Sequence, residues 1–146
     1  MIRILRGNDL AAVMQIWLKT NRKAHDFISE NYWTDNYATV NEILPQAEVY
    51  VYEDDTTNQI DGFIGFTDNN YIAGIFVREA AQSKGIGKQL LNYAKEIKST
   101  MILRVYQKNT RAVSFYQREQ FAIQSENVDD STNEKEYVMT WSKKTK

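Results

Sequence analysis

Two glycines, Gly85 and Gly87, stand one residue apart between a strand-like run and a helix-like run. The first turn of a helix has backbone N–H groups without intrahelical partners, and the helix dipole favours negative charge there. Glycine at these positions lets an anion approach the backbone without meeting a Cβ atom. Ser83, Lys84 and Lys88 surround the same turn. These residue types at this spacing predict a binding site for a phosphate group.

Two well-known phosphate-binding loops do not fit this segment. A Walker loop requires G-x-x-x-x-G-K-[ST], but Lys88 is followed by Gln89, and no glycine stands five residues before Gly87. A Rossmann fingerprint requires a third glycine where this chain has Leu90. A tight strand-to-helix turn that binds nothing is the plain alternative for an isolated G-x-G.

Hydrophobic spacing predicts the elements that must position this loop. Alternating or continuous apolar runs predict strands, and recurrence at i, i+3, i+4 and i+7 predicts helices. The expected strands cover residues 2–5, 48–53, 60–67, 71–77, 101–106, 121–128 and 136–141. The expected helices are one capped by Asn8 or Asp9 with Leu10, Val13, Met14 and Trp17 on its apolar face, one over 35–44, one with Ile86, Leu90, Ala94 and Ile97 on one face, and one over 110–118. We expect the aromatic-rich residues 24–34 to be irregular.

The resulting order, β-α-α-β-β-β-α-β-α-β-β, predicts an α/β (α+β) fold in which helices pack on a mixed sheet. The chain has 146 residues without an internal repeat or linker, which predicts one domain over residues 1–146. It lacks the run of about 18 apolar residues that a membrane helix needs, and its N-terminal apolar stretch is too short for a secretory signal. A cytoplasmic protein without membrane association is the plain expectation.

The net charge of −1 conceals a segregation of charge along the chain. Residues 24–77 hold ten acidic and no basic residues, whereas residues 78–118 hold nine basic and two acidic ones. One half suits a cationic ligand and the other an anionic one, unless these charges only solvate two surfaces. The chain has no cysteine and one histidine, so no metal is expected. Basic residues form no further patch beyond the glycine loop and the C-terminal tail, so nucleic-acid binding is disfavoured.

Two segments resemble conserved motifs of the GNAT superfamily of N-acetyltransferases. Residues 82–87, Q-S-K-G-I-G, match the Q/R-x-x-G-x-G/A signature of that family. Residues 109–121, N-T-R-A-V-S-F-Y-Q-R-E-Q-F, resemble N-x-x-A-x-x-F-Y-x-x-x-G-F, with Gln120 in place of the glycine. The order of elements over the whole chain is also similar to that of the family. The resemblance implies a mostly antiparallel sheet and an enzyme that uses acetyl-CoA.

The resemblance also implies which residues hold acetyl-CoA as a co-substrate. Its pyrophosphate would lie on the amides of the glycine loop, and its pantetheine arm would add to the edge of the strand before the loop. A strand amide at Phe76 or Val77 could stabilise the oxyanion. The cofactor-binding residues implied in this way are Ile75, Phe76, Val77, Gln82, Ser83, Lys84, Gly85, Ile86, Gly87, Lys88, Asn109 and Tyr116.

Two residues of the second motif are implied to act near the thioester. Tyr116 matches the family tyrosine that protonates or hydrogen-bonds the departing thiolate, and a phenol with a pKa near 10 can donate to such a sulfur. Asn109 matches an asparagine that contacts the cofactor. The alternatives are a buried aromatic beside Phe115 for Tyr116 and a helix N-cap for Asn109.

The general base is left open by the resemblance. Related protein-N-terminal acetyltransferases carry a glutamate five residues before the asparagine, and this chain has Arg104 there. An amine acceptor must lose a proton, so another group has to take it. His25, whose imidazole titrates near neutrality, and Glu30 are the candidate catalytic bases, because both lie in the segment that forms a wall of the acceptor cleft in this fold.

Residues 24–33 also resemble a segment of bacterial YiaC-type lysine acetyltransferases, which favours a lysine or similar amine as the acceptor. Asp26, Phe27 and Trp33 are the expected substrate-binding residues, because a carboxylate beside aromatic faces suits a cation. The alternative is that these aromatic residues are core contacts of two short helices.

The sequence predicts an N-acetyltransferase that moves an acetyl group directly to a primary amine, in a small molecule or a lysine-bearing peptide, with both reactants in one cleft. A catalytically silent acyl-CoA-binding sensor is the main alternative, and Arg104 is the residue that supports it. An acetyltransferase that acts on aminoacyl-tRNA is disfavoured by the acidic acceptor half. The chain is expected to be a monomer or homodimer.

Overall fold

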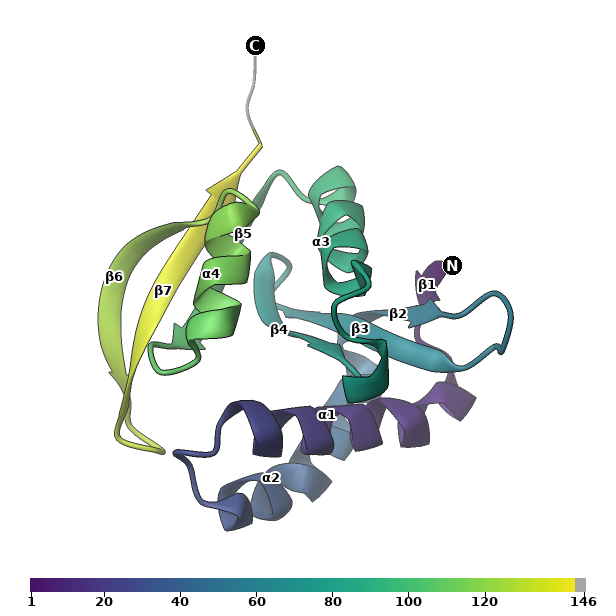
Figure 1. Ribbon diagram of the computed structural model, residues 1–146, viewed down its shortest axis with the longest axis horizontal. Coiled ribbons are helices and arrows are strands. Elements are labelled where there is room, and N and C mark those ends of the chain that lie inside the picture. The colour runs from purple at the N-terminus through teal and green to yellow at the C-terminus, as the bar shows by residue number, and fades with distance from the viewer. Residues whose placement is uncertain (144–146) are drawn as a thin grey trace.

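The computed structural model describes residues 1–143 and contains one seven-stranded sheet with the order β1-β2-β3-β4-β5-β7-β6 (Figure 1). The strands are β1 (Ile2–Ile4), β2 (Glu48–Glu53), β3 (Ile60–Thr67), β4 (Tyr71–Val77), β5 (Thr100–Tyr106), β6 (Ala122–Asp129) and β7 (Glu134–Ser142). The α-helices are α1 (Leu10–Ala24), α2 (Glu30–Ile43), α3 (Ile86–Ile97) and α4 (Thr110–Arg118). Short 3-10 turns are η1 (Gly7–Asp9), η2 (Leu44–Gln46) and η3 (Glu79–Ala81).

The sheet separates two hydrophobic cores. On the face covered by α3 and α4, strands β3, β4 and β5 contribute the buried residues Ile64, Ile72 and Leu103. On the opposite face, α1 and α2 cover β2 and β3, where Val49 and Phe63 are buried. Alternate residues of a strand point to opposite faces, so one sheet supports both layers.

The order of elements and the mostly antiparallel sheet are confirmed, and one helix boundary was predicted wrongly. Helix α2 begins at Glu30, so residues 30–34 are helical and not irregular. The Ser29 side chain caps this helix by accepting a hydrogen bond from the Asn31 N–H (3.3 Å), a local signal that outweighs the density of aromatic residues. Ile97, expected on the buried face of α3, is 45% exposed at the end of that helix.

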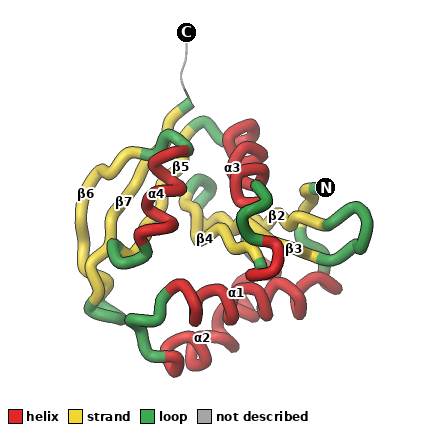
Figure 2. Tube along the Cα trace, in the orientation of Figure 1, coloured by secondary structure: helices red, strands yellow, loops and turns green. Residues whose placement is uncertain are grey.

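The fold opens between its two central strands. All other neighbouring strands are antiparallel, but β4 and β5 are parallel and pair only at Tyr71–Ile102 and Ile72–Leu103. Beyond these pairs the strands diverge, and Figure 2 shows β5, β7 and β6 turned away from the other strands. Residue Ala73 is an extra residue in β4, because Gly65 pairs with Gly74 while Phe66 pairs with Ile72. The last residues of β4 therefore lack a partner strand on the β5 side.

Within residues 1–143, none of the helices combines the length and the apolar character that a membrane span requires.

Candidate functional site

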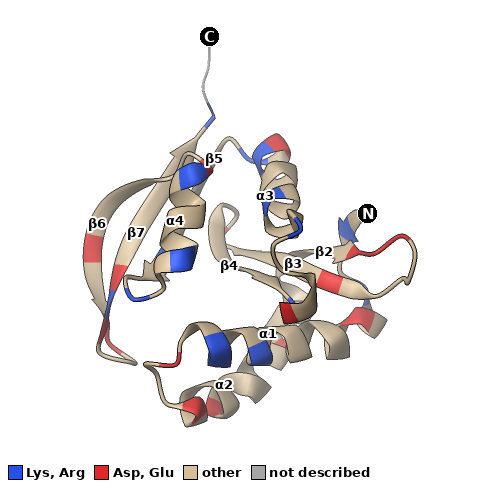
Figure 3. Cartoon of the chain, viewed as in Figure 1, with Lys and Arg blue, Asp and Glu red and all other residues tan. Residues whose placement is uncertain are grey.

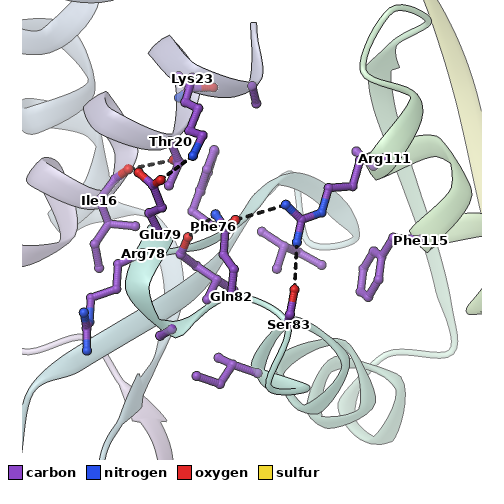
Figure 4. Close-up of a pocket in the computed structure, with 18 of the residues that line it drawn as sticks. Ile16, Thr20, Lys23, Phe76, Arg78, Glu79, Gln82, Ser83, Arg111 and Phe115 are labelled. Carbon is purple, nitrogen blue, oxygen red and sulfur yellow. Dashed lines mark hydrogen bonds and ion pairs between the residues drawn. The ribbon is translucent and has the colours of Figure 1, made fainter.

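A cleft of about 1360 Å³ lies where β4 and β5 separate. Its walls come from α1, the end of β4, η3, the glycine loop, the first turn of α3, and α4 along its length. Figure 4 shows Ser83 and Gln82 on one side of this space, with Arg111 and Phe115 of α4 on the other. The motifs found in the sequence, although more than twenty residues apart, therefore meet in one cavity.

The glycine loop has the backbone conformation of an anion site. Ser83 (φ +66°) and Gly85 (φ +83°) are both left-handed, whereas Lys84 between them is not. Alternation of this kind turns successive N–H groups toward one point. Gly85 is the N-cap residue of α3 and has no side chain that could occupy the N–H groups of the first turn. The first intrahelical hydrogen bond runs from the Gln89 N–H to the Gly85 carbonyl (3.0 Å). The N–H groups of residues 86–88 precede that bond and remain available to a ligand.

The two glycines differ in what they allow. A Cβ at Gly85 would meet no atom within 4 Å, so this position requires glycine for its left-handed backbone. A Cβ at Gly87 would lie 3.6 Å from the Phe115 ring, which is an ordinary contact distance. The requirement for glycine is therefore stronger at Gly85 than at Gly87.

Two polar side chains brace the loop. Gln82 donates from Nε2 to the Val77 carbonyl (2.9 Å), which fixes the loop to the end of β4. Arg111 reaches across from α4 and donates to Gln82 Oε1 (3.1 Å) and Ser83 Oγ (3.3 Å). Sequence reasoning did not select Arg111. Its spacing four residues before Phe115, on the same helical face, is the signal that could have identified it.

The cleft has an excess of positive charge. Its lining includes seven basic and three acidic residues: Lys19, Lys23, Arg78, Lys88, Lys108, Arg111 and Arg118, with Asp26, Glu79 and Glu119. Lys23 is paired with Glu79, and Arg78 with Asp61. Figure 3 shows that α1 also carries Lys and Arg, so the cationic lining is not confined to residues 78–118 as the charge pattern suggested. Such a cleft suits a ligand with several phosphates.

Tyr116 of α4 is a buried residue of the cleft lining. It is 7% exposed, lines the cavity and packs against Phe115 and Phe121 at ring-centroid distances of 5.3 and 5.5 Å. Burial raises the pKa of its phenol well above the usual value near 10. Tyr116 therefore stays protonated at neutral pH and can act as a hydrogen-bond donor within the cleft. Phe115 lines the same cavity, so both aromatic neighbours border the cleft.

Asn109 and His25, two predicted site residues, contact each other. Asn109 Oδ1 caps α4 by accepting from the Ala112 N–H (3.2 Å), so its Nδ2 faces His25 Nε2 at 3.1 Å. An amide nitrogen can only donate, which makes Nε2 the acceptor and places the imidazole proton on Nδ1. Burial lowers the pKa of His25 to about 4. In this arrangement His25 is a neutral group that holds Asn109. The lone pair on its Nε2 already accepts the Asn109 hydrogen bond, so it is not available to take a proton from a substrate.

This arrangement makes stability depend on the protonation of the only histidine. Between pH 6.5 and about 4 the unfolded chain binds a proton at His25 that the folded chain excludes. The free energy of unfolding should therefore fall as pH decreases through this window, by roughly 3 kcal/mol in total. Urea unfolding at several pH values would measure the fall. The variant His25→Gln removes the titration, so equal pH dependence in both proteins would contradict this assignment.

Four predicted residues lie outside the cleft lining: Phe27, Glu30, Trp33 and Lys84. Trp33 is 7% exposed, stacks on His25 and meets the edge of Trp17, so it is a core contact, as the structural alternative proposed. Glu30 is exposed in the first turn of α2. All other predicted site residues, including Asp26, line the cleft.

Phe27, although outside the cleft lining, contacts a lysine of this chain. The Lys108 ammonium lies 5.4 Å from the centroid of the Phe27 ring and 3.1 Å from Glu134 Oε1. Phe27 in turn packs edge-on against Tyr106. An aromatic face and a carboxylate therefore bind an alkylammonium group at this place.

Gln120, which replaces the usual glycine of the second motif, has φ +77°. The Phe121 N–H donates to the Tyr116 carbonyl (3.0 Å), which closes the end of α4. The turn thus has the left-handed backbone that glycine adopts most readily, and it is formed here without glycine.

Comparison with known proteins agrees with this geometry. Residues 45–123 match the acetyltransferase (GNAT) domain family. The chain is 34% identical over 142 residues to the peptidyl-lysine N-acetyltransferase YiaC of Escherichia coli, covering 97% of this chain and 96% of YiaC. The solution structure of apo YjaB from Escherichia coli has a TM-score of 0.85 at 23% identity and covers 99% of this chain and 98% of its own.

A structure of an aminoglycoside 6'-N-acetyltransferase complexed with coenzyme A has the same fold, with a TM-score of 0.73 at 15% identity, covering 100% of this chain and 98% of the other. The family match spans more than half of the chain, and the YiaC match spans nearly all of it. The chain therefore belongs to the GNAT family of N-acetyltransferases.

Proposed function

We propose that the protein transfers the acetyl group of acetyl-CoA directly to the side-chain amine of lysine, with both substrates bound in the cleft. The observation that carries this proposal is the meeting of three features in one cavity. These are the left-handed loop of Ser83 and Gly85, the unpaired edge of β4, and the buried Tyr116 phenol.

Acetyl-CoA fits the residues that line the cleft. The loop amides and the first turn of α3 suit the pyrophosphate, and Lys19, Lys88 and Arg118 supply positive charge without an ion pair among residues 1–143. The open edge of β4 over residues 73–77 suits the amide-bearing pantetheine arm, which can pair as a strand does. The coenzyme A complex of a protein with the same fold supports this choice.

A lysine acceptor is supported by the relatives and by one residue of the cleft. Relatives that share most of this chain's length are named peptidyl-lysine N-acetyltransferases. Asp26 lines the cleft and offers a carboxylate to the ammonium group of an incoming lysine.

The residues of the cleft would act in the following way. The backbone N–H of Phe76 or Val77 would donate to the carbonyl oxygen while negative charge develops there. Tyr116 would donate its phenolic proton to the sulfur as the carbon–sulfur bond breaks. Asn109, held by His25, would orient the arm that carries the thioester. Much of the rate would come from positioning two reactants in one cavity.

Release of the CoA thiol tests this function against the alternative of a silent acyl-CoA sensor. Acetyl-CoA is incubated with the protein and a panel of lysine peptides, polyamines, amino acids and aminoglycosides. Thiol release with the lysine peptides is the expected result. Tight binding of acetyl-CoA without thiol release from any amine would support the sensor instead. Release only with small amines would contradict the lysine acceptor and leave the acetyltransferase activity intact.

A further inference from the structure

The face of β5 opposite α3 carries an ionisable cluster that the site described above does not use. Met101, Leu103 and Val105 of β5 point into the core beneath α3, so Arg104 and Tyr106 point to the other face. Glu136 of β7 pairs directly with Tyr106 and lies on this second face. Tyr71 of β4 joins them, because it pairs with Ile102, two residues before Arg104.

Glu136 is buried without a close partner. The residue is 7% exposed and its side chain 9%. Its nearest opposite charge is Arg104 Nη1, at 3.9 Å from Oε1, and among residues 1–143 its carboxylate accepts no hydrogen bond. The Tyr106 hydroxyl donates to Asp129 Oδ2 (2.6 Å) instead. Burying a carboxylate with so few partners is unfavourable for folding, so stability does not account for a glutamate here.

The charged and titratable groups that face Glu136 come from three strands: Arg104 and Tyr106 of β5, Asp129 of β6, and Tyr71 of β4. Burial is the main cause that raises the pKa of Glu136, and the charge of Asp129 adds to it, whereas Arg104 acts in the opposite direction. A carboxylate with a raised pKa binds a proton more readily than an ordinary glutamate.

The position of Glu136 relative to the open edge of β4 suits proton transfer. The pairs Tyr71–Ile102 and Ile72–Leu103 close the gap between β4 and β5, and Arg104 is the next residue of β5 beyond them. Tyr116 belongs to the core on the α3 side of the sheet. Glu136 lies on the other side, the side on which Tyr106 packs against Phe27 and His25. Proton donor and acceptor are thus on opposite sides of the gap.

The two candidate bases taken from the sequence do not have this geometry. His25 Nε2 accepts from Asn109, and its Nδ1 is buried without a partner among the described residues. Neither glutamate lines the cleft itself, but Glu30 is exposed in the first turn of α2, whereas Glu136 is buried beside Tyr106, which packs against the cleft residue His25.

We propose that Glu136 is the general base of the reaction and takes the place of the glutamate that the sequence lacks at Arg104. This inference rests on the proposed function. Because Glu136 does not line the cleft itself, it accepts through one water the proton that the lysine amine loses as its nitrogen bonds to the acetyl carbon. Tyr116 gives its proton to the sulfur as the carbon–sulfur bond breaks, and returns to its phenol form from solvent. Starting from the neutral amine, the proton that Glu136 releases to solvent equals the one that Tyr116 takes up, so the products are acetyl-lysine and the CoA thiol.

The test compares Glu136→Gln with wild type and with Glu126→Gln, a β6 variant whose carboxylate accepts from Gln107. Glu136→Gln should lower kcat about 100-fold or more, whereas Glu126→Gln should leave it unchanged. Acetyl-CoA affinity measured by calorimetry should be unchanged in both variants, and the thermal midpoint of Glu136→Gln should be unchanged or higher, because that variant removes a buried carboxylate. A loss of affinity or of folding in Glu136→Gln that matches the loss of rate would overturn the assignment.

A second variant gives a readout that a structural role would not move. Arg104 lowers the pKa of Glu136, so Arg104→Gln should raise that pKa, which carbon-13 NMR of the glutamate carboxyl measures in the free protein. The acid limb of the rate profile should move to higher pH by the same amount. If the NMR pKa moves and the acid limb does not, Glu136 is not the base. If wild type itself releases no thiol with any amine, the proposed function fails, and the failure is distinct from that of Glu136.

Discussion

Replacing Tyr116 by phenylalanine should lower kcat by about 100-fold or more and leave the affinity for acetyl-CoA nearly unchanged. The phenol is buried, lines the cleft and keeps its proton at neutral pH, so it is placed to protonate the departing sulfur. Phenylalanine keeps the ring packing against Phe115 and Phe121. Thiol release with a lysine peptide measures the rate, and calorimetry measures the binding.

Tyr137→Phe is the matched control, because Tyr137 is a partly buried tyrosine of β7 that packs against the same core and has no role in the site. This variant should retain the wild-type rate. Equal rates in Tyr116→Phe and wild type would show that another group or solvent protonates the sulfur, and the role of Tyr116 would then be restricted to packing.

Gly85→Ala should weaken acetyl-CoA binding by about 5- to 30-fold. Its φ of +83° is left-handed, and a residue with a Cβ in that conformation is disfavoured by about 1–2 kcal/mol. Because the added Cβ would meet no atom within 4 Å, the effect is one of backbone conformation alone. The loop would spend part of its time in a conformation that turns the N–H groups away from the pyrophosphate. The dissociation constant from calorimetry checks this expectation.

Gly7→Ala provides the comparison for Gly85. Gly7 is also open to a Cβ, but its φ is not left-handed and it lies in η1, outside the cleft. Its substitution should leave binding unchanged. An equal loss of affinity in both variants would indicate a general effect on folding, and no loss at Gly85 would show that the loop amides do not hold the phosphates.

Much of the fold follows from local patterns in the sequence. Strands β2, β3 and β4 were predicted at their observed bounds, because each is a strongly apolar or alternating run that ends at polar turn residues. The start of α2 was missed because an N-cap at Ser29 depends on one hydrogen bond, whereas the aromatic residues after it are poor helix formers. The divergence of β4 from β5 was not predicted, and the family resemblance implied only a free edge on the strand before the glycine loop.

The site was predicted best where its residues are close in sequence. The glycine loop and the motif around Asn109 are contiguous, so their spacing together with the family resemblance identifies them. Arg111 was missed because its partners Gln82 and Ser83 are 29 and 28 residues away. The lysines of α1 were missed because they lie outside the basic segment of the chain.

Glu136 could not be found from the sequence for a related reason. Its burial and its position opposite Tyr106 depend on the register between β5 and β7, and a shift of one residue would turn it to the other face. A glutamate in an otherwise alternating strand reads as a solvent-facing residue. In the structure the same residue is almost fully buried.

The central claim is that this chain acetylates the side chain of lysine from acetyl-CoA. The most direct test uses a peptide with a blocked N-terminus and one lysine, incubated with acetyl-CoA and the wild-type protein and analysed by tandem mass spectrometry. The account predicts one added acetyl group on the lysine Nζ, which is lost when lysine is replaced by arginine in the peptide. Transfer only to a peptide with a free α-amine, or no transfer despite acetyl-CoA binding, would contradict it.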